Sequence, residues 1–392
     1  MSSVKIYRIS RKWKIFFAIA AAPLAALFGW LMIMPLLEGR SNETGFVLLC
    51  LLLGGGFMLF FLFALISVFK DRLEVHPEKI RDVCFLGTTE LYLNDISGFR
   101  ILPTQYVQML IIQPKHSTAK KIKVALIIDH KEELLEWLNQ NLVNLDSQEY
   151  QEEMDQLLSD PELGASEEQR LSLLNRAKRW SMILNGLAIV SSLWVLIRPQ
   201  PYTYAIWTSI SLPLIALFSL RYFNNVIKLN DKYQSAYPNV ALAFIIPCLG
   251  LALRALSDFN ILCWDHFWLP FLSFSLATFI LVLFFAQDVR NKSGQLILLF
   301  LFCTIYGYST VILLNGVLDR SSPSTYRANV IEKRISKGKH TSYYLKISPW
   351  GPRKGQEEID VGRSIYNRYD TGDSVQIIVK QGRFEIPWFF VR

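Results

Sequence analysis

Long uncharged apolar runs alternate with polar stretches along this chain. Seven runs are long enough to cross a bilayer whose hydrocarbon core is about 30 Å thick. They lie near residues 14–37, 46–69, 180–197, 204–220, 239–257, 266–286 and 295–318. Arg254 interrupts the end of the fifth run, and six helices would remain if that run lay in the interface. The pattern predicts an integral membrane α-helical bundle with about seven transmembrane helices.

The first apolar run follows a basic segment, and Ala18-Ile19-Ala20 resembles a signal-peptide cleavage site. Cleavage there would leave an apolar region of only a few residues. The run continues without charge to Leu37, which is typical of a membrane anchor. We therefore predict that the first helix is retained.

The polar stretches define the remaining domains. The predicted organisation is an N-terminal helical hairpin, an α+β domain, a helical linker, a five-helix membrane region and a C-terminal β-barrel domain. Their respective ranges are 1–69, 70–143, 144–179, 180–318 and 319–392.

Alternating apolar and polar residues predict several strands in the domain 70–143, followed by one helix. A turn is expected at Gly87-Thr88-Thr89, and Asp129 with Glu132 suggests a capping box at the helix start. The predicted strands are 72–75, 79–86, 90–102, 106–113 and 121–128. Strands closed by one amphipathic helix indicate an α+β layout.

Two membrane helices followed by Ile80-Arg81, a turn, a strand leading into Asn94-Asp95-Ile96 and a closing helix resemble the bacterial pleckstrin-homology-like domains of small membrane proteins. The resemblance covers about residues 30–142 and implies a module that faces lipid or protein rather than an active site. Residues 70–143 contain ten basic and ten acidic side chains, so the domain as a whole has no positive excess.

Four lysines cluster at and just beyond the turn between the last two predicted strands. They are Lys115, Lys120, Lys121 and Lys123. Lysines near a membrane attract anionic lipid by about 1 kcal/mol each. The alternative is a solvated hairpin tip whose lysines discourage edge-to-edge pairing. These four residues are the candidate lipid contact of the chain.

The C-terminal domain also shows a β pattern, with predicted strands at 328–335, 342–347, 358–361, 374–380 and 384–391. Five short strands suggest a small barrel of the OB or SH3 kind. The run from Ile365 to Val375, followed by Gly382 and Trp388, resembles small extramembrane β-barrels appended to bacterial membrane proteins. The basic, aromatic composition also suits single-stranded nucleic acid, but the expected extracytoplasmic location argues against such a partner and favours aromatics in the core.

Lysine and arginine are more frequent in one set of short loops than in the other, which orients the chain. The bias predicts that the N-terminus and residues 70–179 are cytoplasmic, and an odd number of helices then places residues 319–392 outside. The expected location is the bacterial cytoplasmic (inner) membrane.

The five cysteines and five histidines are scattered, so no metal-ligand spacing, catalytic motif or cofactor site is expected. The sequence favours a non-enzymatic membrane scaffold or sensor with lipid partners and candidate protein partners on either side of the membrane. The alternative is a transporter or binder of a lipid or other apolar molecule. A cluster of Arg254, Asp258, Asp265 and His266 would instead favour an enzyme.

Overall fold

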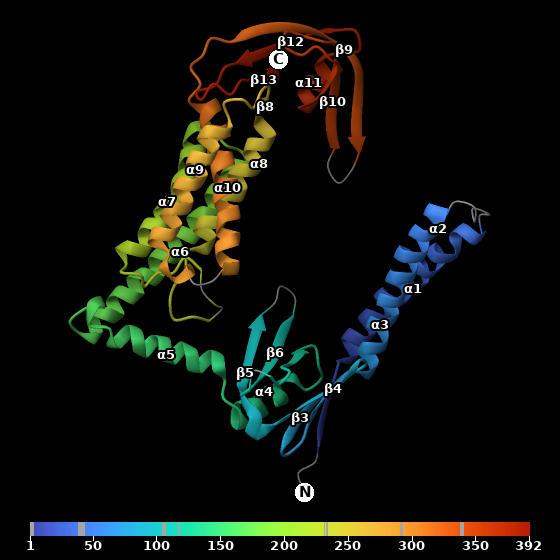
Figure 1. The fold of residues 1–392 in the computed structure, drawn as a ribbon, viewed down its shortest axis with the longest axis vertical. Helices are drawn as coiled ribbons and strands as arrows, with labels where there is room; N and C mark the ends of the chain where they lie inside the picture. Colours follow the sequence, from blue (N-terminus) through green and yellow to red (C-terminus); the bar gives the residue numbers. More distant parts are fainter. Residues whose placement is uncertain are drawn as a thin grey trace. The chain divides into compact units, whose positions relative to one another are not determined.

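The computed structural model describes residues 4–37, 44–103, 107–116, 118–230, 232, 234–290, 293–337 and 341–392. The chain forms two compact units (Figure 1). One comprises Met1–Asp155 with Tyr233–Ala236, and the other comprises Gln156–Lys232 with Tyr237–Arg392.

The first unit contains a helical hairpin. Helix α1 (Arg11–Leu37) packs against a second helical segment made of α2 (Thr44–Cys50), a π-helical turn (Leu51–Gly55) and α3 (Gly56–Lys70). Gly54 lies directly against α1, because a β-carbon there would be 2.7 Å from the backbone nitrogen of Met32. The second helical segment therefore approaches α1 closely at Gly54.

Both ends of this hairpin enter one antiparallel sheet. The sheet has the order β1 (Lys5–Arg8), β2 (Arg72–Val75), β3 (Lys79–Cys84) and β4 (Gly87–Tyr92). Strand β1 precedes α1 and β2 follows α3, with Tyr7 opposite Leu73. Strand β1 is not predicted by the sequence pattern, because four residues between basic side chains resemble an ordinary membrane flank.

A second antiparallel sheet completes the fold of this domain. It consists of β5 (Ile96–Pro103), β6 (Gln108–Pro114) and β7 (Ile122–Ala125), and helix α4 (Lys131–Asn141) follows. The shared core includes the fully buried side chains of Ile80, Phe99, Leu110 and Leu134. Strands and one helix therefore share a core, as an α+β layout requires.

Three local predictions for this domain are wrong. The turn lies at Phe85 and Leu86 rather than at 87–89, and a short 3-10 helix (Leu93–Asp95) divides the expected strand 90–102 between the two sheets. The capping box is also absent, since His130 precedes α4 in a left-handed conformation without a side-chain cap. The Asp129 N–H instead donates to the Arg8 carbonyl at 2.9 Å, which ties this segment to the N-terminal strand. Tyr106 and Ser117, in the predicted strand 106–113 and the lysine turn, lie outside the described residues.

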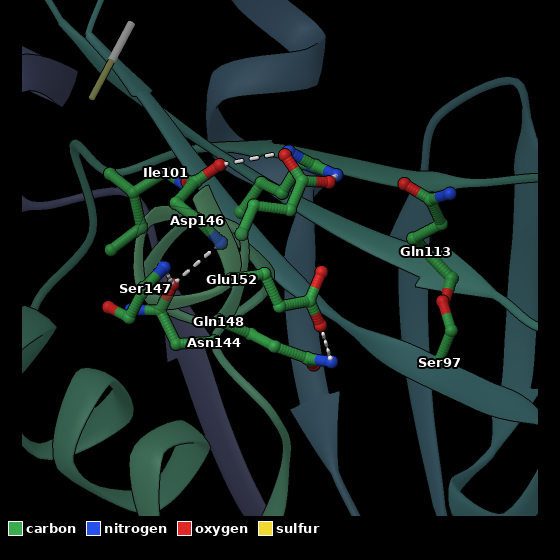
Figure 2. A network of polar contacts seen from close by, with 10 residues as sticks. Ser97, Ile101, Gln113, Asn144, Asp146, Ser147, Gln148 and Glu152 are labelled. Atoms are coloured by element: carbon green, nitrogen blue, oxygen red, sulfur yellow. Dashed lines mark hydrogen bonds and ion pairs between the residues drawn. The ribbon is translucent and has the colours of Figure 1, made fainter. Parts of the chain in front are cut away.

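Helix α5 (Leu145–Ser159) begins on the edge of the second sheet (Figure 2). The Asn144 side-chain oxygen caps the helix by accepting from the N–H groups of Asp146 and Ser147 at 3.1 and 3.2 Å. The Asp146 carboxylate accepts from the Ile101 N–H at 3.0 Å and pairs with Arg100 at 3.1 Å. The first turn of α5 is thereby fixed to β5.

The second unit contains five long helices. They are α6 (Glu167–Ile197), α7 (Tyr202–Tyr222), α8 (Ala241–Asp258), α9 (Trp268–Phe285) and α10 (Ser293–Val317), with short 3-10 helices at Pro161–Leu163 and Gln287–Val289. Together with Arg11–Pro35 and Gly45–Lys70, these make seven helices in the described chain that are long and apolar enough to cross a membrane. The weak fifth run qualifies despite Arg254, so the molecule has the architecture of a multi-pass membrane protein.

Polar side chains inside the bundle join neighbouring helices. The buried Tyr306 hydroxyl of α10 donates to the Ile210 carbonyl of α7 at 2.7 Å. Asn185 of α6 bridges the start of α8, donating to the Asn239 carbonyl and accepting from the Ala243 N–H, both at 2.9 Å. These groups therefore have structural partners.

The C-terminal domain is one curled six-stranded sheet, half of a barrel. Its order is β11 (Glu357–Val361), β10 (Thr341–Ile347), β9 (Ser324–Lys337), β12 (Ser374–Lys380), β13 (Trp388–Val391) and β8 (Asn260–Ile261). Helix α11 (Arg363–Arg368) follows β11. The five predicted strands are present, whereas β8 is a two-residue strand from the loop between α8 and α9 that the sequence pattern could not reveal. The core of the C-terminal sheet contains aromatic side chains, including the buried Trp350 and Phe389.

The loop between β12 and β13 fixes this sheet to the end of α10. Buried Asn315 donates to the Ile386 carbonyl at 2.8 Å and accepts from the Phe384 N–H at 2.9 Å. The Asp319 carboxylate accepts from the Gly382 N–H at 3.1 Å and from the Trp388 indole N–H at 2.9 Å. Sheet and helices thus share one hydrogen-bonded junction.

Candidate functional site

A groove of about 760 Å³ opens between the β3–β4 hairpin and the residues around the start of β7. Its lining includes Lys120, Lys121 and Lys123 on one side and Asp82, Cys84, Leu86, Gly87, Thr88 and Thr89 on the other. The structure therefore brings three of the four predicted lysines together. Lys115 is exposed on the same connection but does not line this groove.

Strand alternation explains which side chains face the groove. Ile122 is fully buried, so its neighbours Lys121 and Lys123 point to the opposite, exposed face of β7. Asp82 and Cys84 share the face of β3 with buried Ile80, but they lie beyond the core at the end of the strand. A smaller cavity of about 130 Å³ continues from the same residues.

The groove has an excess of positive charge. Among the described residues, no carboxylate forms an ion pair with Lys120, Lys121 or Lys123. Asp82 is the acidic residue in the lining, and burial raises its pKa, an effect that the Cys84 hydrogen bond and the charge of Lys120 oppose. Three unpaired ammonium groups against one carboxylate favour an anionic ligand.

Cys84 is not an activated nucleophile in this setting. Burial and the negative charge of Asp82 raise the pKa of its thiol to about 12. The thiol donates to Asp82 Oδ1 at 3.4 Å, which further favours the protonated form. A reactive cysteine needs the opposite, a lowered pKa.

The groove lies beside the end of the helical hairpin. The Phe85 ring packs edge-on against Phe63 of α3 with centroids 5.8 Å apart, and the Lys70 ammonium lies 5.2 Å from the Phe85 centroid. Phe63 precedes Lys70 by seven residues, about 10 Å along the helix. Leu86 follows Phe85 in this turn and is 81% exposed. The turn therefore runs alongside the last two turns of an apolar helix, where a membrane-spanning segment meets water.

Phe85 lies within the predicted strand 79–86, and the sequence pattern does not connect it with α3. The groove partners Asp82, Thr88 and Thr89 were likewise missed, because they are separated from the lysines by about 30 residues or more. The one local signal was an apolar Phe85-Leu86 pair directly before a glycine, which is unusual at a solvent-exposed turn.

The four residues whose clustering would favour an enzyme do not form one cluster. Arg254 pairs with Asp258 at 2.6 Å, and the Tyr202 hydroxyl donates to the same carboxylate at 2.7 Å. Asp265 accepts from the Cys263 thiol at 2.7 Å, whereas His266 faces Glu385 at 3.8 Å. Within the described ranges, no group of three or more His, Cys, Asp and Glu side chains is arranged to hold a metal ion.

No family model matches this chain, and searches of the curated proteins and of the solved structures find no significant similarity to it. The function is therefore inferred from the geometry of the groove and from its position beside α3.

Proposed function

We propose that this chain is a non-enzymatic membrane scaffold or sensor whose domain 70–143 recognises anionic phospholipid head groups at the membrane surface. In this proposal the domain is a pleckstrin-homology-like module. The supporting observation is the lysine groove, with Lys120, Lys121 and Lys123 unpaired beside a Phe85-Leu86 turn that packs on α3. A head group would meet the lysines while Leu86 enters the interface.

The proposed orientation places the N-terminus and this domain in the cytoplasm of a bacterium and the C-terminal sheet on the other side of the inner membrane. The pairing of β1 with β2 supports a shared side for the N-terminus and the domain 70–143, since both ends of the helical hairpin then lie on one side of the membrane. The lysine and arginine bias of the short loops supports the choice of side. Anionic lipids of the cytoplasmic leaflet would then be within reach.

The lipid contact can be tested with the full-length protein in phosphatidylcholine nanodiscs containing 20% phosphatidylglycerol. Bound lipid is counted by native mass spectrometry after transfer to mild detergent. We expect K120Q/K121Q to weaken retention of phosphatidylglycerol by about fivefold per lysine, from about 1 kcal/mol each. The control K115Q/K131Q removes the same charge outside the groove. Equal losses in both variants would contradict a specific site.

The scaffold role can be tested by crosslinking in native membranes followed by mass spectrometry. The scaffold role is supported if the same proteins are crosslinked reproducibly to both units. A single enriched lipid without protein neighbours would favour the second candidate function, binding or transport of an apolar molecule. An apolar groove of about 680 Å³ between α8, α9 and α10 favours that alternative, since Trp264, Phe267, Trp268 and Phe271 line it.

A further inference from the structure

A second groove, of about 570 Å³, lies between the N-terminal half of α6 and the C-terminal half of α7. Its α6 wall contains Arg176, Arg179, Trp180 and Ile183, which follow the i, i+3, i+4, i+7 spacing of one helix face. The α7 wall has the same spacing from Ile215 to Tyr222. The groove therefore runs between one face of α6 and one face of α7 within the second unit.

The lining changes character along the helix axis in the order of a phospholipid. Arg176 and Arg179 lie at one end, Trp180 and Tyr222 follow, and the apolar wall beyond includes Ile183. Arg176 and Ile183 are separated by about 10 Å along the helix. Charged, aromatic and apolar side chains are preferred in this order from head group to hydrocarbon.

The two arginines are available to an anion. Both are exposed, and in the described part of the chain no carboxylate pairs with either of them. Guanidinium groups bind phosphate oxygens in a bidentate manner, so two of them one turn apart suit a phosphodiester. Free phosphate would use only this end of the groove and leave the apolar wall uncovered.

The depth of the groove also matches the boundary of a membrane. Helix α6 has 31 residues, about 46 Å, which exceeds the hydrocarbon thickness of about 30 Å. Its charged first turns end at Arg179, and uncharged residues follow to Ile197. Ser219 is buried and contributes a small side chain to the lining, while Trp180 lies against Phe223 with centroids 6.5 Å apart.

We infer that this groove binds one anionic glycerophospholipid. Its phosphate lies between Arg176 and Arg179, its glycerol ester region beside Trp180 and Tyr222, and the start of one acyl chain along Ile183. This site is separate from the lysine groove and does not depend on it. A bound lipid would cover the apolar surface between the N-terminal half of α6 and the C-terminal half of α7.

The test uses the full-length protein in phosphatidylcholine nanodiscs with 10% phosphatidylglycerol, and native mass spectrometry counts the retained lipid. R176Q/R179Q is expected to lose one tightly held phosphatidylglycerol per chain and at least tenfold in apparent affinity. K178Q/R221Q is the matched control, because these neighbouring cations do not line the groove. Retention lost equally in both variants would overturn the inference, since it would indicate diffuse charge attraction.

A second variant, I183Q, leaves both arginines in place and changes the exposed apolar wall. We expect it to weaken phosphatidylglycerol binding severalfold without changing the unfolding temperature. Unchanged binding in I183Q, or displacement of the lipid by 10 mM inorganic phosphate, would show that the arginines bind an anion without its acyl chain and would overturn the lipid assignment. These variants leave the lysine groove unchanged. A loss of bound lipid in them therefore tests the arginine groove, whereas a loss in K120Q/K121Q tests the lysine groove.

Discussion

The side-chain amide of Asn315 lies directly against Gly382, where a β-carbon would be 2.3 Å from both Nδ2 and Oδ1. Gly382 also has a φ of +76°, a conformation that other residues adopt only at a cost. Asn315 holds the backbone of Phe384 and Ile386, so this contact determines how the β12–β13 loop meets α10.

Replacing Gly382 by alanine should therefore destabilise this junction by about 3 kcal/mol, from left-handed strain and overpacking together. Hydrogen exchange of β12 and β13 in detergent would measure the loss. Gly372 is the matched control, since its φ is +98° but a β-carbon at this position would meet no atom within 4 Å. G372A should cost about 1 kcal/mol from strain alone. Similar losses in the two variants would contradict the Asn315 contact.

Acid should weaken the same junction through Asp319. Burial would raise the pKa of this carboxyl, but hydrogen bonds from Ser321 and Trp388 and the charge of Lys380 outweigh it and lower the pKa. The folded pKa then lies below the unfolded value near 3.8. The stabilisation is complete above that value and is lost as the pH falls through the folded pKa.

Thermal unfolding of the C-terminal sheet between pH 5 and pH 2.5 can check this expectation. The wild-type protein should lose stability across that interval. D319N should be less stable at pH 5 and show a flatter acid dependence. D370N is the control, because the Asp370 side chain is 91% exposed and its variant should keep the wild-type slope. An unchanged slope in D319N would exclude Asp319 as the acid-sensitive group.

Cys84 should react slowly with maleimides at pH 8, although the residue is exposed and its thiol is only partly covered. Burial and the charge of Asp82 raise the pKa of the thiol to about 12, so little thiolate is present. D82N removes that charge and should accelerate labelling severalfold, since each unit of pKa changes the thiolate fraction tenfold. The measurement needs a protein in which Cys84 is the single cysteine, and D95N serves as control. Equal rates in D82N and the parent would contradict the electrostatic explanation.

Asp146 should hold the start of α5 on the second sheet. D146N weakens the contacts with Arg100 and with the Ile101 N–H, and we expect a loss of about 2 kcal/mol. Amide exchange in the first turns of α5 should accelerate accordingly. E152Q is a matched control, because Glu152 on the same helix accepts a hydrogen bond from exposed Gln148 (Figure 2) and, among the described residues, from no other side chain. Its loss should stay below about 0.5 kcal/mol. Equal exchange rates would argue against the Asp146 contact.

The helices could be located from the sequence because the length of an apolar run is a one-dimensional property matched to a bilayer. The predicted segments near 46–69 and 295–318 lie within one or two residues of the helical ranges Gly45–Lys70 and Ser293–Val317. Strands with regular alternation, such as β12, could be predicted for the same reason. Strand β1 could not, because Lys5 pairs with Val75, 70 positions further along the chain.

The candidate sites also have features that the sequence reveals and features that only the folded structure reveals. Lysine clustering within a few residues is visible in the sequence, so Lys120, Lys121 and Lys123 were identifiable there. Their opposition to Asp82 and Thr88, and the packing of Phe85 on Phe63, depend on contacts between separate strands and helices. The arginine groove likewise exists only where α6 meets α7. Local composition determined the membrane helices and the lysines, whereas only tertiary packing, which joins residues distant in sequence, decided which side chains share a groove.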